Sequence, residues 1–293
     1  MSFIAGLESF VRSKEPLAPH LWLRVGGEAE FFAEPHSVEQ LSTLLARCKQ
    51  ESKPVRLLGG GSNVLAADAG VRGVVIRLAD PQFAKIEVQN QRITAGGGAR
   101  LGHVVNSAVA AGLAGLEALV GIPGTIGGAL HSNAGGRGGD IGQWTRAARV
   151  MNHAGEIVER QREELDFAYR QSSLDDLVIL EADFDLESDD PIELTKRMQK
   201  QWILKKAGQP LSNQNTGCIF KNPRGIGAGM LIDQCGLKGL RIGGAEVSDR
   251  HANYFITHDG ATCRDVLALI EQVRARVSEK MGIDLETQIE LWQ

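Results

Sequence analysis

The chain has 293 residues, of which 43% are hydrophobic and 23% are charged, as is typical of a soluble globular protein. Its formal net charge of −4 offers no general attraction for nucleic acid or anionic membranes, so binding of a phosphate must be local. The four cysteines lie far apart without a C-x-x-C pair, which indicates neither a metal site nor a disulfide framework. No apolar run suits a signal peptide or a membrane span, so we expect a cytoplasmic protein with no nucleic-acid, membrane or metal partner.

The first half of the chain reads as strands and helices separated by glycine turns. We predict a helix at the N-terminus and then an extended stretch over residues 21–27. Ser37 is predicted to begin a second helix, because Gln40 completes a capping box and apolar residues follow at helical spacing. The other predicted elements are strands at 55–58, 74–78, 86–88 and 92–95 and a helix at 100–111.

A glycine turn follows the strand at 55–58 directly and consists of Gly59, Gly60, Gly61, Ser62 and Asn63. A strand that runs into such a turn is arranged, in principle, like a phosphate-binding loop. The pattern is neither G-x-x-x-x-G-K-[ST] nor G-x-G-x-x-G, so it predicts neither a P-loop nor a Rossmann nucleotide site.

The stretch from Gly121 to Ile141, GIPGTIGGALHSNAGGRGGDI, has an unusual composition. Eight of its 21 residues are glycine, which neither a helix nor a strand favours. Its interleaved aliphatic residues need burial, which argues against a flexible linker. Because glycine lets backbone N–H groups approach a ligand without an intervening Cβ atom, we predict a structured loop that lines a site for a phosphate or a flat ring.

The second half of the chain changes character. A β-hairpin is predicted over residues 149–160 around Ala154-Gly155, followed by a strand at 177–186. The acidic segment 187–191 marks the best domain boundary and begins a helix, since acidic residues and proline favour a helix N-terminus.

The last predicted helix, at 264–281, has clear end signals. Thr262 is its N-cap, Asp265 completes a capping box, and Gly282 ends it. A strand at 283–292 then closes the chain.

Four motifs occur together in a specific order and spacing. They are GGGSNVL at 59–65, GIPGTIGG at 121–128 with Asn133-Ala134-Gly135, YRQS at 169–172, and GCIFKNP at 217–223. From about residue 21 to the C-terminus the sequence resembles the UDP-N-acetylenolpyruvoylglucosamine reductase family, flavoenzymes that complete UDP-N-acetylmuramate in peptidoglycan synthesis. The short interval between Arg170 and Asn215 is similar to the family branch that lacks an inserted substrate-covering loop.

The resemblance implies an α+β protein with a vanillyl-alcohol-oxidase/PCMH-like FAD-binding fold, followed by a smaller α+β substrate domain. We expect the FAD-binding region at 1–188, in two subdomains split near residue 80, and the substrate-binding domain at 189–293. The resemblance also implies non-covalent FAD, NADPH as co-substrate, a UDP-sugar substrate and a monomer. The implied cofactor-binding residues are Gly59, Gly60, Gly61, Ser62 and Asn63 at the pyrophosphate, and Gly121, Pro123, Gly124, Thr125, Gly128, Asn133 and Gly135 near the isoalloxazine.

The family's reaction implies roles for two further residues. NADPH reduces FAD, the flavin N5 delivers hydride to C3 of the enolpyruvyl ether, and C2 is then protonated. Arg170 matches the family's arginine, whose planar guanidinium suits the carboxylate on which negative charge develops; a surface salt bridge is the alternative. Cys218 stands where the family usually has a serine proton donor. A thiol, with a pKa of about 8.5, donates a proton more readily than an alcohol does. The alternative is that Cys218 is an inert buried thiol.

The resemblance places the UDP and sugar of the substrate near Tyr169, Lys206, Lys221 and Asn222. For the two lysines, a role as solvated surface charges stays open.

One position departs from the family pattern. Gln288 occupies the place of a glutamate that assists protonation, and an amide cannot titrate. Residues 286, 288 and 290 point to one face of a strand, so we predict that Glu290 supplies the missing carboxylate, with Glu286 as the alternative.

Two other functions stay open at this point. One is another FAD oxidoreductase of the same fold, acting on a sugar or hydroxy acid, which would not need Arg170 and the Cys218–Asn222 motif. The other is a catalytically weak flavin or nucleotide-sugar binding protein, suggested by Gln288.

Overall fold

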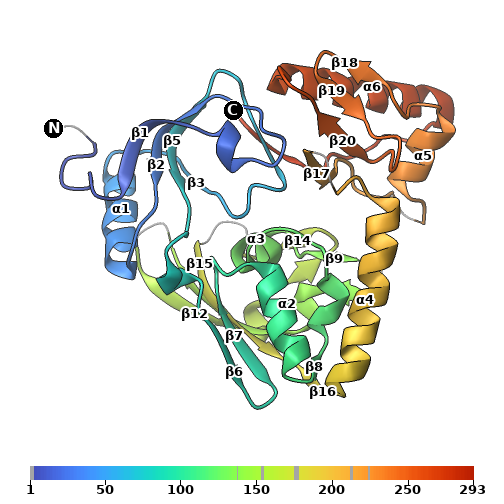
Figure 1. Cartoon of the computed structure of the whole chain (residues 1–293). Helices are drawn as coiled ribbons and strands as arrows, with labels where there is room; N and C mark the ends of the chain where they lie inside the picture. Colours follow the sequence, from blue (N-terminus) through green and yellow to red (C-terminus); the bar gives the residue numbers. More distant parts are fainter. Residues whose placement is uncertain (1–2, 137, 153–154, 175–177, 212–213, 224) are drawn as a thin grey trace. The chain divides into compact units, whose positions relative to one another are not determined.

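The computed structural model describes residues 3–136, 138–152, 155–174, 178–211, 214–223 and 225–293 (Figure 1). The chain divides into two compact units. Unit 1 comprises Met1–Ser13, Phe31–Gly60 and Gly73–Leu204, and unit 2 comprises Lys14–Glu30, Gly61–Arg72 and Lys205–Gln293. No helix in the described ranges is long and apolar enough to span a membrane.

Helices and strands occur in both units. The α-helices are α1 Val38–Gln50, α2 Leu101–Ala110, α3 Ile126–His131, α4 Pro191–Gly208, α5 Ala228–Gln234 and α6 Cys263–Met281. The strands are β1 Val11–Pro16, β2 Glu28–Ala33, β3 Val55–Leu57, β4 Val64–Ala66, β5 Val71–Ile76, β6 Ile86–Gln89, β7 Arg92–Gly96, β8 Leu113–Ala114, β9 Gly135–Gly136, β10 Gly139–Asp140, β11 Thr145–Met151, β12 Ile157–Gln161, β13 Phe167–Ala168, β14 Gln171–Ser172, β15 Val178–Asp185, β16 Glu187–Ser188, β17 Asn215–Cys218, β18 Arg241–Ile242, β19 Ala245–Val247, β20 Tyr254–Thr257 and β21 Glu290–Trp292.

The larger sheet of unit 1 is antiparallel, with strand order β12-β11-β15-β7-β6. Helix α2 packs against β6 and β7, and the short helix α3 packs against β7 and β15 (Figure 1). A single apolar core joins these elements and includes Ile93, Val104, Leu130, Val150 and Phe184. The glycine-rich stretch between α2 and β11 is anchored in this core by its aliphatic residues Ile126, Leu130 and Ile141.

A second sheet has the order β1-β2-β5-β3. Within each of β1, β2 and β5 the chain passes from one compact unit to the other. Helix α1 belongs to the same layer, because Leu41, Leu44 and Leu45 share a core with Val74 and Ile76 of β5. Strands β3 and β5 are parallel, and β3 leads directly into the Gly59 turn.

Unit 2 is built on a sheet of order β17-β20-β19-β18, against which α6 packs, and α5 packs against α6. The C-terminal segment extends this unit through an isolated bridge between Phe220 and Thr287 and through parallel pairing of β21 with β4. Its core includes Phe220, Phe255 and Val273, all at most 1% exposed.

Most predicted elements are confirmed, and four differ. The predicted extended stretch at 21–27 is wrong over its first half, because residues 21–23 form a turn and Arg24 has φ 55°. Residues 3–10 form turns and Val11–Pro16 is a strand, so the predicted N-terminal helix is wrong. The stretch 121–141 contains the helix α3, because buried Ile126 and Leu130 outweigh the cost of its glycines. The terminal strand is shorter than predicted, since regular pairing covers only Glu290–Trp292.

Two sequence predictions have no structural outcome. Ala154, at the predicted hairpin turn, lies outside the described residues. The predicted domain division at residues 188 and 189 stays a prediction, while the compact units divide at Leu204 and Lys205.

The capping box of α6 provides a test of the local energetics. Thr262 Oγ1 accepts from Asp265 N at 3.1 Å, and Asp265 Oδ2 accepts from Thr262 N at 3.0 Å. We expect Thr262→Ala to lower the free energy of unfolding by about 1 kcal/mol, because it leaves a helical N–H group without its acceptor. Urea unfolding measures this loss; Ser278→Ala, within the same helix, should change stability much less, and equal effects would contradict the capping role.

Candidate active site

The turn formed by residues 59–63 offers unused backbone donors. Within the described part of the chain, none of its five N–H groups donates a hydrogen bond to protein. A Cβ atom on Gly60 would lie 2.6 Å from the Cα atom of Gly124, and one on Gly59 would lie 2.9 Å from Oγ1 of Thr125. The glycines are therefore required for the packing of two loops against each other, a role that the sequence did not separate from ligand approach.

The partner loop, residues 121–128, has left-handed glycines at Gly121 (φ 74°) and Gly124 (φ 116°). Thr125 caps α3 by accepting a hydrogen bond from Gly128 N at 3.4 Å. Among the described residues, the N–H groups of Gly121, Gly124 and Thr125 donate no hydrogen bond to protein. The turn at residues 59–63 and the loop at 121–128 thus present N–H groups that donate no bond within the described chain, as an anionic or strongly polar ligand requires.

Gly97 supports the partner loop and was not predicted as a site residue. Its N donates to Leu180 O and its O accepts from Gly127 N, both at 2.8 Å. A Cβ atom at Gly97 would collide with Ile179 O. The run Gly96-Gly97-Gly98 was the available signal, but a run of glycines does not tell which backbone approaches which.

Asn133, predicted to bind a cofactor, uses its side chain inside the protein. It is 2% exposed, donates from Nδ2 to Ala168 O at 2.8 Å and accepts at Oδ1 from Gly142 N at 3.1 Å. These bonds join the glycine-rich stretch to the β13–β14 hairpin, which carries Tyr169 and Arg170 as its turn. Asn133 therefore positions the hairpin that bears Arg170.

Arg170 is half-buried and adopts a left-handed backbone conformation, with φ 58°. That conformation costs a non-glycine residue about 1 kcal/mol, so its surroundings hold it in place. Its Nη2 donates to Gly135 O at 2.9 Å, and its guanidinium carbon lies 5.4 Å from the centre of the exposed Tyr169 ring. The structure thus brings Arg170, Tyr169 and the predicted cofactor residue Gly135 together.

In unit 2, Asn63 joins the glycine turn to the C-terminal segment. Its Nδ2 donates to Gln288 O at 3.1 Å, and its O accepts from Glu290 N at 3.0 Å. Glu290 is exposed, and its Oε1 accepts from Trp292 Nε1 at 3.0 Å. The backbones of Gln288 and Glu290 are therefore fixed beside Asn63. The Glu290 carboxylate accepts its hydrogen bond from Trp292, a residue of its own strand.

The motif Cys218–Asn222 runs beside the same C-terminal segment. Gln288 N donates to Ile219 O at 2.7 Å, and Lys221 N donates to Glu286 O at 2.8 Å. Lys221 Nζ also lies 2.6 Å from Glu286 Oε1, so Glu286 serves as the counter-ion of Lys221. Asn222 accepts at Oδ1 from Ala228 N at 2.9 Å, at the start of α5.

The cysteines of the chain differ in their environments. Burial raises the pKa of Cys48 to about 11, and burial with the nearby Asp68 carboxylate raises the pKa of Cys263 to about 11. Both thiols stay protonated and are inert at neutral pH. Cys218 is partly exposed on β17, as a residue that exchanges a proton with a ligand must be.

Two polar atoms of unit 2 fit a bound cofactor or substrate. In the described ranges, Asn63 Oδ1 and Thr216 Oγ1 are the buried side-chain atoms that lack a hydrogen-bond partner. Buried polar atoms are rarely left unsatisfied, and each needs an explanation such as a ligand. Asn63 ends the predicted pyrophosphate turn, and Thr216 directly precedes the predicted motif at 217–223, so one atom lies in a predicted site motif and the other next to one.

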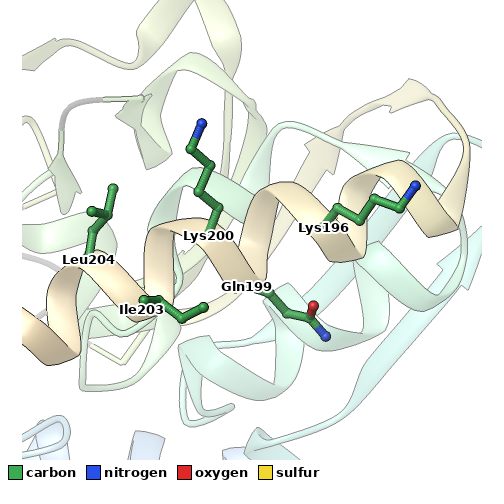
Figure 2. Close-up of a pocket in the computed structure, with 5 residues that line it drawn as sticks. All are labelled: Lys196, Gln199, Lys200, Ile203 and Leu204. Carbon is green, nitrogen blue, oxygen red and sulfur yellow. The ribbon is translucent and has the colours of Figure 1, made fainter.

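Lys206, predicted to contact substrate, is exposed near the end of α4, where its backbone O accepts from Arg250 Nη2 at 3.3 Å. Earlier turns of α4 carry a pocket of about 320 Å³ whose lining side chains all come from that helix: Lys196, Gln199, Lys200, Ile203 and Leu204 (Figure 2). No predicted site residue lines this pocket, so it does not bear on the predicted chemistry.

The contact between Gly60 and Gly124 can be tested directly. Gly60→Ala should lower the thermal midpoint, because its methyl group would overlap backbone that cannot rotate away, at a cost of about 1–3 kcal/mol. Gly136→Ala is the matched control, since a Cβ atom there meets nothing within 4 Å. Equal midpoints for the two variants would show that the loops can separate at little cost.

Comparison with known proteins gives two family matches. Residues 209–292 match the C-terminal domain of UDP-N-acetylenolpyruvoylglucosamine reductase, and residues 29–160 match an FAD binding domain. Curated relatives with the name UDP-N-acetylenolpyruvoylglucosamine reductase include one from Heliobacterium modesticaldum, 42% identical over 94% of this chain and 88% of the relative. Another, from Listeria innocua, is 39% identical over 96% of this chain and 94% of the relative.

Among solved structures, the chain is similar to UDP-N-acetylenolpyruvylglucosamine reductase (MurB) from Thermus caldophilus. The TM-score is 0.85 at 37% identity, covering 97% of this chain and all of the other. A glucose dehydrogenase, Phl p 4.0202, has a TM-score of 0.52 at 12% identity, which shows a shared fold alone. The predicted α+β class, with a PCMH-like FAD-binding fold and a smaller α+β domain, is confirmed.

Proposed function

Because the chain belongs to the UDP-N-acetylenolpyruvoylglucosamine reductase family, we propose that it reduces UDP-N-acetylenolpyruvoylglucosamine to UDP-N-acetylmuramate, using NADPH and bound FAD. The observation that carries the proposal is the placement of Arg170, whose guanidinium is bonded to Gly135 of the glycine-rich stretch. Another FAD oxidoreductase or a weak binding protein is not favoured, since similarity to reductases covers nearly the whole chain.

The free donors of both glycine loops suit a pyrophosphate and a ring with carbonyl groups. We assign the cofactor to residues 59–63 and to Gly121, Gly124 and Thr125, whose N–H groups donate no bond within the described chain. Pro123 and Gly128 shape this second loop, and Gly135 lies beside Arg170. Bound FAD would supply the hydride chemistry, in which hydride from NADPH reaches C3 of the enolpyruvyl group.

The chain's own groups then serve the carboxylate and the proton. Hydride addition at C3 builds negative charge on the C2–carboxylate unit, and the fixed Arg170 guanidinium stabilises that charge. The Cys218 thiol gives its proton to C2, which completes the saturated product, and the thiolate recovers a proton from solvent. Tyr169, beside Arg170, and Lys206, Lys221 and Asn222 of unit 2 would bind the UDP-sugar.

We further propose a monomer that acts in the cytoplasm. Each compact unit buries an apolar core of its own, so neither needs a second copy to fold. NADPH and UDP-sugars are highly charged nucleotides, which do not cross a membrane unaided and are available where they are made.

The purified protein should be yellow, and denaturation should release FAD, because the loops supply donors without a covalent attachment. Addition of the enolpyruvyl substrate should start NADPH oxidation, measured by the loss of absorbance. A colourless protein that cannot take up FAD would refute the cofactor, whereas a yellow protein whose NADPH oxidation ignores the substrate would refute the substrate.

Arg170→Lys should slow turnover by roughly 10²–10³-fold while FAD content stays normal. A lysine point charge cannot reproduce the planar guanidinium that holds both Gly135 O and a carboxylate. Stopped-flow oxidation of the reduced flavin by substrate measures the loss. Arg162→Lys is a matched control outside the predicted site, and an unchanged rate in Arg170→Lys would remove Arg170 from the mechanism.

The helper carboxylate is tested by three substitutions, for which we propose Glu290 as the acid. Glu290→Gln should slow the oxidation of reduced flavin by substrate, whereas Glu286→Gln should act mainly on substrate affinity, because Glu286 pairs with Lys221. Gln288→Glu should increase the rate if position 288 can still assist protonation. If Glu290→Gln reacts as fast as the parent, Glu290 is only a charge on the strand surface.

A further inference from the structure

Asn253 holds the peptide of Phe220 by both of its polar groups. Its Nδ2 donates to Phe220 O and its Oδ1 accepts from Phe220 N, each at 2.9 Å. Its backbone O also accepts from Ile219 N at 2.9 Å. Asn253 is 1% exposed and Phe220 is 1% exposed, so water cannot replace these bonds.

The two side-chain bonds of Asn253 to Phe220, called the clamp below, lie where the sheet of unit 2 is irregular. Regular pairing of β17 with β20 ends where Cys218 faces Tyr254, and the register shifts between Asn215 and Cys218. Gly217, with φ 75°, turns the strand within this irregular stretch. After the bond from Ile219 N to Asn253 O, the described strand makes no further backbone hydrogen bond on the β20 side, and the Asn253 side-chain amide binds the N–H and C=O groups of Phe220 there instead.

The opposite edge of the same segment is held by backbone bonds. Ile219 O accepts from Gln288 N, and Lys221 N donates to Glu286 O. Residues 219–221 are therefore fixed from both sides, and Cys218 is the next residue toward the irregular stretch. Loss of the Asn253 bonds would free the peptide that directly follows Ile219, while the other edge stays paired.

The position of Asn253 is itself fixed by a short turn. Its N–H donates to His251 Nδ1 at 3.2 Å, and Tyr254 N donates to His251 O at 2.9 Å. Burial lowers the pKa of His251, which keeps the ring neutral and able to accept this bond near pH 7. The His251 ring also packs on the Tyr254 ring, with centroids 4.7 Å apart.

We propose that Asn253 is a positioning residue for the reaction: it holds the Phe220 peptide and thereby fixes the Cys218 thiol where it donates its proton. This inference rests on the proposed function, in which Cys218 is the proton donor. It assigns a functional reason to a buried asparagine that lies outside the predicted site motifs.

The first measurement is amide hydrogen exchange of the holoenzyme, which does not depend on activity. Asn253→Ala and Asn253→Asp should each accelerate exchange of the Phe220 N–H by at least about tenfold. In Asn253→Ala the Phe220 N–H loses its acceptor, and in Asn253→Asp the Phe220 O loses its donor. Asn253→Asp keeps the volume and the Phe220 N–H acceptor, so it remains informative if Asn253→Ala does not fold. Unchanged exchange in a folded variant would overturn the clamp.

The second measurement separates positioning from stability through a double-mutant cycle. Asn253→Ala should slow oxidation of reduced flavin by substrate by about 10²-fold, the order expected for misplacement of a reacting group. Reduction of the flavin by NADPH, which needs no proton from Cys218, should stay within about threefold. In the Cys218→Ala background the same substitution should have little further effect, because the two residues act as one unit.

Val273→Ala is the control, since it removes buried volume from α6 of the same unit without removing a hydrogen bond of residues 218–221. It should affect both half-reactions alike. Equal slowing of both half-reactions by Asn253→Ala, or full additivity with Cys218→Ala, would overturn the positioning role alone. A parent enzyme whose reduced flavin is never oxidised by the substrate would instead overturn the proposed function.

Discussion

The backbones of Gly60 and Gly124 approach so closely that a methyl group on Gly60 would lie 2.6 Å from the Cα atom of Gly124. This contact fixes the direction of both glycine loops and so decides where their unused N–H groups point. The loops rest on a further glycine, Gly97, whose carbonyl accepts from Gly127. A site made of backbone donors needs such support, because no side chain is present to correct its geometry.

In unit 2, a row of hydrogen bonds across four chain segments holds the backbone near Cys218 in place. Asn63 Nδ2 binds Gln288 O, Gln288 N binds Ile219 O, and Ile219 N binds Asn253 O. The row passes directly beside Cys218, and it begins at the residue whose Oδ1 is left without a protein partner in the described structure. The turn at residues 59–63 and the strand that carries Cys218 are thereby parts of one hydrogen-bonded framework.

Local signals in the sequence were enough for elements whose causes are local. Thr262, Asp265 and Gly282 define α6 because capping depends on residues three or four positions apart. Residues 3–10 were mistaken for a helix, since the pairing of β1 with β2 and burial of Phe3 and Phe10 depend on distant parts of the chain. Burial of Ile126 and Leu130 in the same way produces a helix within a glycine-rich stretch.

The candidate site also contains features that the sequence could indicate and features that it could not. Motifs singled out the two glycine loops, Arg170 and Cys218, because their residue types and spacing are themselves the signal. The sequence could not show that Asn133 binds the β13–β14 hairpin or that Glu286 pairs with Lys221, since these contacts span 35 and 65 positions. Asn253 carried no signal, because a buried asparagine bonded to a distant peptide has no characteristic neighbours in the chain.

The pairing of β21 with β4 has a consequence for the order in which the protein is made. Val64–Ala66 emerge early from the ribosome, whereas their partners, Glu290–Trp292, are joined much later. Until these residues have emerged, β4 lacks its partner strand and Asn63 lacks the Gln288 carbonyl that it binds. Contacts between such distant segments form slowly, because a long loop must close first. Unit 2 therefore gains this pairing late in synthesis, and a nascent chain that stops before Gln288 lacks the backbone that holds the turn at residues 59–63.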